Sequence, residues 1–140
     1  MAERFVVDCS VAAEWVLPEP GREAALAIYD RYAAGSIELI APDLLLAEFA
    51  SLLARRCRRK QISHTQGREA FRLMTLCAPE LVETRSRVAE ALDFSLRFHL
   101  SLRDSIYLAV AREFDCPVLT ADARLVRAAR GAETTVHLVR

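Results

Sequence analysis

Two aspartates in the sequence follow short apolar runs that are typical of buried parallel strands. Asp8 ends the run at residues 5–7, and Asp122 comes just after the run at residues 118–120. In open parallel sheets, ligands bind beyond the carboxyl ends of the strands, so we expect these two carboxylates to share one crevice. Each aspartate also has a purely structural explanation, because Asp8 could begin a turn and Asp122 could cap a helix.

Two further acids interrupt apolar helical segments. Glu48 lies within the segment LLLAEFA, and Asp104 begins the segment DSIYLA. Glu48 could instead pair with Arg55 or face solvent, and Asp104 could close a capping box with Ser101. Carboxylates that converge repel one another unless a cation neutralises them, and oxygen ligands of this kind suit Mg²⁺ or Mn²⁺. The sequence by itself does not establish that the four acids meet.

Several other chemistries lack their motifs in this sequence. The chain has no GxGxxG, no GxxxxGK[ST] and no GxSxG, which argues against dinucleotide, P-loop and nucleophile-elbow sites. Its histidines lack metal-ligand spacing, and its cysteines include no CxxC pair, so we expect reduced thiols without zinc. A phosphotransferase of the haloacid-dehalogenase type would use Asp8 as nucleophile, but the second aspartate that it needs is replaced by Ser10.

The charge of the chain is balanced, with 19 basic and 19 acidic side chains. No global field therefore draws the protein to nucleic acid or to an anionic membrane, and any RNA contact must be local. The one dense basic run consists of Arg55, Arg56, Arg58, Arg59 and Lys60. This run either holds RNA phosphates or is a solvated helix end that the helix dipole favours. Arg103 likewise either contacts substrate or pairs with an acid.

Short apolar runs alternate with helical patterns along the 140-residue chain. We expect strands at residues 5–7, 37–41, 81–82, 117–120 and 135–139. We expect helices at residues 10–17, 23–34, 43–59, 63–77, 88–98 and 102–114, with a last one between 122 and 131. This alternation predicts one α/β domain over residues 1–140, with a central, mainly parallel sheet and helices on both faces. Without a signal-peptide or membrane-spanning pattern, the prediction is a cytoplasmic protein with no membrane partner.

The segments around the four acids resemble the acidic motifs of a known family. VVDCSVAAEWVLPE, at residues 6–19, resembles the opening of PIN-domain ribonucleases, in particular the VapC-like toxins of bacterial toxin–antitoxin pairs. PDLLLAE, LRDSIYLA and LTAD resemble the second, third and fourth acidic motifs of that family. The resemblance covers residues 6–139 and implies a PIN-like α/β fold.

The same resemblance implies a function and a set of site residues. Catalysis and binding of Mg²⁺ or Mn²⁺ would fall to the four acids Asp8, Glu48, Asp104 and Asp122. The hydroxyls of Ser10 and Thr120 would support these acids. The chain would be a metal-dependent endoribonuclease toxin, a homodimer inhibited by a cognate VapB-like antitoxin. The alternative is a non-catalytic PIN-like binding module, which loss of an acid would favour, yet all four acids are present.

Overall fold

The computed structural model describes residues 2–140, and their five strands form a single sheet in the order β3-β2-β1-β4-β5. The strands are β1 (Glu3–Val7), β2 (Ile37–Pro42), β3 (Glu80–Val82), β4 (Val118–Thr120) and β5 (Val136–Leu138). Every pairing between neighbouring strands is parallel, so all carboxyl ends meet at one edge of the sheet. The predicted parallel sheet is confirmed, and it is parallel throughout.

The central strand β1 is longer than the apolar run at residues 5–7 from which it was predicted. It begins at Glu3, ahead of the apolar run, because its first residues pair in register with β2. Arg4 lies opposite Glu38 in that register, and the Arg4 Nε donates to the Glu38 carboxylate at 2.9 Å. This exposed cross-strand ion pair extends the strand without apolar side chains.

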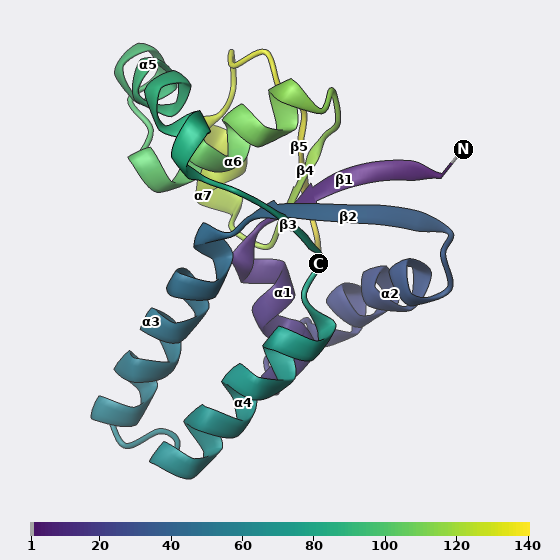
Figure 1. Ribbon diagram of the computed structural model, residues 1–140, viewed down its shortest axis with the longest axis vertical. Helices are drawn as coiled ribbons and strands as arrows, with labels where there is room; N and C mark the ends of the chain where they lie inside the picture. The colour runs from purple at the N-terminus through teal and green to yellow at the C-terminus, as the bar shows by residue number, and fades with distance from the viewer. Residues whose placement is uncertain (1) are drawn as a thin grey trace.

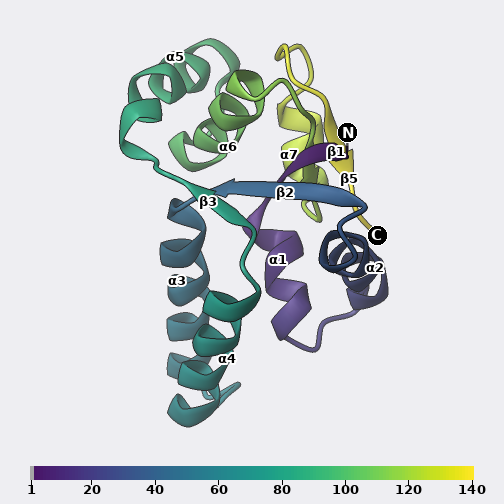
Figure 2. The same ribbon diagram turned by 45° about the vertical axis from the view of Figure 1, so that its right-hand side comes forward.

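Seven α-helices cover the sheet in the described part of the chain. They are α1 (Cys9–Val16), α2 (Arg22–Ala33), α3 (Leu44–Arg58), α4 (His64–Cys77), α5 (Val88–Phe98), α6 (Leu102–Glu113) and α7 (Ala123–Ala128). Figures 1 and 2 show α1 to α4 on one side of the sheet and α5 and α6 on the other, which confirms helices on both faces. None of the helices in residues 2–140 combines the length and the apolar character that a membrane crossing requires.

Helices α3 and α4 form a hairpin that extends away from the sheet (Figure 1). Its second helix begins with the predicted capping box. The Ser63 hydroxyl accepts from the Gln66 backbone N–H at 3.0 Å, and the Gln66 side chain accepts from the Ser63 N–H at 2.8 Å. A cap of this kind contributes about 1 kcal/mol, and it fixes where the chain turns back toward the sheet.

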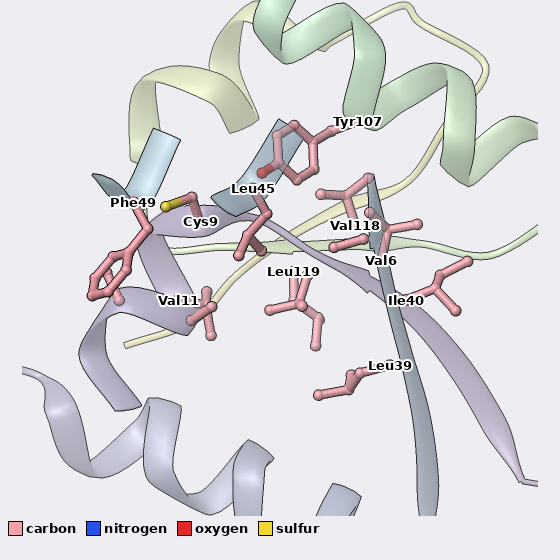
Figure 3. Close-up of a cluster of buried hydrophobic side chains, with 14 of the residues drawn as sticks. Val6, Cys9, Val11, Leu39, Ile40, Leu45, Phe49, Tyr107, Val118 and Leu119 are labelled. Atoms are coloured by element: carbon pink, nitrogen blue, oxygen red, sulfur yellow. The ribbon is translucent and has the colours of Figure 1, made fainter. Parts of the chain in front are cut away.

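The core between sheet and helices includes the hydroxyl of a buried tyrosine, Tyr107. Figure 3 shows Val6 and Val118 of adjacent strands beside Leu45 of α3 and Tyr107 of α6. All four side chains are fully buried. Burial of each such apolar side chain stabilises the fold by roughly 1.5–3 kcal/mol. Tyr107 adds a hydroxyl, and a buried hydroxyl requires a hydrogen-bond partner.

Candidate active site

Asp8 is the first carboxylate at the carboxyl edge of the sheet, since β1 ends one residue before it and α1 begins one residue after it. Its side chain makes no helix cap. Instead its Oδ2 accepts two hydrogen bonds of 2.8 Å, from the hydroxyls of Ser10 and Thr120. Thr120 ends β4 and is fully buried, and Ser10 Oγ also accepts from the Ala121 N–H at 2.9 Å. The two predicted supporting hydroxyls therefore do contact an acid.

Glu48 reaches the same edge from the second turn of α3. Its Oε1 accepts from the Tyr107 hydroxyl at 2.6 Å, and its Oε2 lies 3.2 Å from Arg103 Nε. The Glu48 side chain is only 11% exposed. Arg55, the alternative partner, contacts Ser51 at 3.5 Å instead. The partners of Glu48 therefore come from α6, and the proposed pairing with Arg55 is wrong.

Asp104 and Asp122 are joined by Arg124, which lies two residues after Asp122. Arg124 Nη2 lies 3.0 Å from Asp104 Oδ2 and 3.1 Å from Asp122 Oδ2. Both acids also sit at helix starts, as their structural explanations require. Ser101 Oγ accepts from the Asp104 N–H at 3.1 Å, and Asp122 Oδ1 accepts from the Arg124 N–H at 2.9 Å. Asp122 thus combines capping with a place at the site, whereas the Asp104 carboxylate bonds Arg124 and does not close the expected capping box with Ser101.

The electrostatics show that three of the acids are close neighbours. Burial raises the pKa of Asp8 above its usual value, against the hydrogen bonds from the two hydroxyls, and the charge of Asp104 raises it further. Burial also raises the pKa of Glu48, to about 7, against the hydrogen bond from Tyr107. The charges of Asp8 and Asp104 add to that rise. The charge of Asp104 therefore disfavours ionisation of Asp8, and the charges of both aspartates disfavour ionisation of Glu48.

The donor set fits a hard divalent cation, although the carboxylates do not form a closed ligand shell. Among residues 2–140, no group of three or more His, Cys, Asp or Glu side chains is arranged to hold a metal ion. Arg103 and Arg124 instead neutralise three of the acids. All the donors are carboxylate oxygens, which Mg²⁺ and Mn²⁺ prefer, and their mutual repulsion is what a bound cation relieves.

The predicted basic run lies along the last part of α3, and its members have different surroundings. The charges of Arg55 and Arg103 both lower the pKa of the Cys9 thiol, next to Asp8, although burial raises that pKa overall. Arg56 forms an ion pair with Glu19. The remaining members, at residues 58–60, end α3 and begin the turn of the hairpin. A rise of 1.5 Å per residue puts them about 15 Å from Glu48 along the helix.

Tyr107 and Arg124 belong to this site although the sequence patterns did not single them out. Tyr107 stands three residues after Asp104, which places both on one face of α6. Arg124 stands two residues after Asp122, in the first turn of the next helix. The sequence did offer a signal for Tyr107, because a spacing of three residues from Asp104 on a helix predicts that the two side chains share a face. The reach of Arg124 to Asp104 depends on how α6 and α7 lie against β4.

The fold makes this chain an α/β protein with an open parallel sheet and four carboxylates at the carboxyl edge of that sheet. Comparison with known sequences identifies the family. The family model described as "PIN domain" matches residues 5–131, and this chain belongs to that family. Its sequence is 35% identical over 103 residues to "Ribonuclease VapC1" of two Mycobacterium tuberculosis strains, over 71% of this chain and 74% of the relative. The chain is thus related to VapC ribonucleases.

Solved structures share the fold at low sequence identity. PAE2754 from Pyrobaculum aerophilum superposes with a TM-score of 0.71 at 17% identity, over 96% of this chain and 83% of that one. VapC20 of Mycobacterium tuberculosis, described as a sarcin-ricin loop cleaving toxin, gives 0.64 at 22%, over 89% and 94%. VapBC2 from Rickettsia felis, bound to a promoter DNA fragment, gives 0.68 at 10%, over 98% and 99%. These likenesses confirm the PIN-like architecture.

Proposed function

We propose that this chain is a VapC-type endoribonuclease toxin that requires Mg²⁺ or Mn²⁺ and is inhibited by a protein antitoxin. The observation that carries the proposal is the meeting of Asp8, Glu48 and Asp104 at one edge of the sheet, with Asp122 linked to Asp104 through Arg124. A binding module without catalysis has no need of four acids in this arrangement. The relation to Ribonuclease VapC1 supports RNA as the substrate.

The roles of the residues follow from their contacts. When bound, a divalent ion supplies Lewis-acid chemistry that activates water near neutral pH and offsets charge on the phosphoryl oxygens. Asp8, Glu48, Asp104 and Asp122 are the residues that would hold it. Two hydroxyls fix Asp8 Oδ2, and the Tyr107 hydroxyl fixes Glu48 Oε1, so these two carboxylates are oriented before substrate arrives.

Substrate phosphates would approach along the arginines that flank the acids. Arg103 is 57% exposed and sits at the edge of the site beside Glu48. Arg55 follows Glu48 by about two helical turns on α3, and its side chain contacts Ser51. The cations at residues 58–60 would extend this track along the hairpin and contact phosphates away from the scissile bond. An enzyme that acts on cellular RNA in this way would work in the cytoplasm.

The antitoxin would cover the helical hairpin. A groove of about 550 Å³ runs between α3 and α4, with walls that are mostly apolar. Its lining includes Ala50, Leu53, Cys57, Gly67 and Phe71. The fold likeness to a VapBC assembly supports a VapB-like partner. An arginine presented by that partner would match the carboxylates, because the guanidinium fork fits them well.

The chain would also form a homodimer. Leu92 and Leu96 follow one another at a spacing of one turn on α5, and they are 51% and 67% exposed. Val88 continues the same stripe and is 38% exposed. An apolar helix face of this kind favours burial against a second copy. Size-exclusion chromatography with light scattering should give a dimer, and Leu96→Glu should give a monomer.

RNA cleavage with and without chelator tests the proposed activity. Purified protein should cut a defined transfer or ribosomal RNA fragment in Mg²⁺ or Mn²⁺, and excess chelator should stop the cleavage. Asp8→Asn provides the control for a contaminating nuclease, because it keeps the shape of the side chain and removes its charge. Cleavage that persists in chelator, with none in Asp8→Asn, contradicts the metal requirement, and equal cleavage by both proteins in Mg²⁺ means that this chain is not the nuclease.

Growth assays test the pairing with an antitoxin. Expression of the chain alone should arrest growth, and co-expression with the antitoxin should restore it. Asp8→Asn should be harmless in either case. If the unaltered chain and Asp8→Asn are equally harmless, the chain is not a toxin.

A further inference from the structure

The guanidinium of Arg124 occupies a position shared by two of the acids. A single nitrogen, Nη2, lies 3.0 Å from Asp104 Oδ2 and 3.1 Å from Asp122 Oδ2. The two oxygens come from different elements, the first turn of α6 and the residue before α7. A positive charge that bridges two carboxylates from separate elements sits where a metal ion shared by them would sit.

Most of the Arg124 side chain lies in solvent, although it contacts a buried acid. Its side chain is 55% exposed, whereas that of Asp104 is only 8% exposed, so the arginine enters the site from the solvent side. Both ion pairs use the same Nη2, and the other guanidinium nitrogens make no recorded bond to these acids. The pair with Asp122 is exposed and contributes little to stability, whereas loss of the pair with Asp104 leaves a buried carboxylate without its counter-ion.

We propose that Arg124 is a built-in counter-ion, which neutralises Asp104 and Asp122 in the metal-free protein and is displaced when a divalent cation binds. The proposal rests on the metal-dependent function proposed above. It follows that Arg124 lowers the affinity of the site for metal, because each ion that enters must first break two contacts with arginine. Arg124 therefore acts on metal binding and has no need to touch the substrate.

The charge of Arg124 can be removed without loss of the local helix. Asp122 caps α7 through the backbone N–H of Arg124, and that bond does not depend on the side chain. Arg124→Gln keeps a similar length and loses only the charge. Arg127→Gln is the matched control, since Arg127 lies in the last turn of the same helix, is exposed, and has no recorded ion pair with an acid in residues 2–140.

Isothermal titration with Mg²⁺ alone, and then with Mn²⁺, measures the effect on metal affinity. Loss of these two ion pairs predicts that Arg124→Gln binds the ion roughly three- to tenfold more tightly than the unaltered chain. Arg124→Lys keeps a charge without the planar fork and should fall between the two. Arg127→Gln should remain within about twofold of the unaltered chain, because a single distant surface charge is largely screened.

Thermal unfolding gives a second measure that does not depend on catalysis. In chelator, Arg124→Gln should melt at a lower temperature than the unaltered chain, because the two acids lose their counter-ion. At a fixed Mg²⁺ concentration it should gain more from the metal, since tighter binding to the folded state stabilises it further. A merely structural arginine would lower the melting temperature by the same amount in both conditions.

The possible outcomes separate this proposal from the proposed function. If the unaltered chain binds Mg²⁺ and Arg124→Gln binds it with equal or lower affinity, the counter-ion role is wrong and the metal site stands. If no variant binds Mg²⁺ or Mn²⁺, the metal-dependent function fails and the counter-ion role fails with it. If Arg124→Gln does not fold, equal metal affinity in Arg124→Lys and the unaltered chain would overturn the proposal.

Discussion

Thr120 Oγ1 donates a hydrogen bond of 2.8 Å to Asp8 Oδ2 across a sequence separation of 112 residues. The same hydroxyl oxygen accepts from the Asp122 N–H at 3.0 Å. A single buried side chain on β4 thus links the carboxylate that follows β1 to the loop that carries the last acid. The relative positions of Asp8 and Asp122 depend on this hydroxyl.

Thr120→Val should damage both stability and activity. Valine has the shape of threonine without its hydroxyl, so the Asp122 N–H loses its acceptor and Asp8 loses one donor. Buried polar groups left without partners cost about 1–3 kcal/mol, which urea unfolding would measure. Thr120→Ser is the control, because it retains the hydroxyl and should retain most of the cleavage rate. Equal losses in both variants would assign the effect to packing.

Asp8→Asn should abolish RNA cleavage without destabilising the metal-free protein. Burial raises the pKa of Asp8, which means that the folded state disfavours its charge. Asparagine removes that charge, and its carbonyl oxygen can still accept from Ser10 and Thr120. The melting temperature in chelator should be equal or higher, and the gain from Mg²⁺ should shrink. A clearly lower melting temperature in chelator would mean that the charge stabilises the fold.

The metal-free protein should lose stability as the pH rises from about 4.5 to about 7, because the Glu48 pKa rises from 4.5 to about 7 on folding. The folded state favours protonated Glu48. The contribution of Glu48 to the free energy of unfolding is therefore fully present below pH 4.5 and is lost as the pH rises through about 7. By linkage the loss is about 3 kcal/mol at most. Chemical unfolding at a series of pH values in chelator measures it.

Glu48→Gln is the matched variant for this pH dependence. Glutamine cannot titrate, so the fall in stability between about pH 4.5 and pH 7 should flatten. Added Mg²⁺ should stabilise the unaltered chain more at the upper end of that range, where Glu48 is ionised and able to bind. If the two proteins show the same slope in chelator, the titration belongs to another group.

Tyr107→Phe should shift the pH dependence of stability to higher pH. The Tyr107 hydroxyl donates to Glu48 and so opposes the rise in the Glu48 pKa that burial causes. Its removal should raise that pKa further and cost roughly 0.5–1.5 kcal/mol at neutral pH. The pH series described for Glu48 provides the measurement. Tyr29→Phe, on α2 and away from the acids, should leave the profile unchanged.

The order of the elements and the positions of the acids could be predicted from the sequence because both depend on local patterns. Alternating apolar runs and helical spacing predicted the parallel sheet, and the pair Ser63 and Gln66 predicted the start of α4. Asp8 and Asp122 follow strands, so their place at the same edge of the sheet follows from the parallel topology. Even the hydroxyls of Ser10 and Thr120 lie beside strand ends and belong to this pattern.

The partners of the acids could not be predicted in the same way, because they depend on how helices pack. Whether Glu48 meets Arg55 or Arg103 depends on the approach of α6 to α3, and the sequence allowed both. Arg124 reaches Asp104 across a separation of 20 residues, which no short-range pattern reveals. The same packing decides that three of the acids contact Arg103 or Arg124, and that no closed shell of carboxylates forms among residues 2–140.

The position of β1 at the centre of the sheet has a consequence for the time at which the site can form during synthesis. Asp8 is made first, but β4, which pairs beside it and supplies Thr120, ends only at residue 120. Arg124 follows later still. Contacts of such long range close late, because the intervening chain must first be ordered. A nascent chain on the ribosome therefore carries no assembled carboxylate site until residues 120–124 have been translated and can pack beside β1.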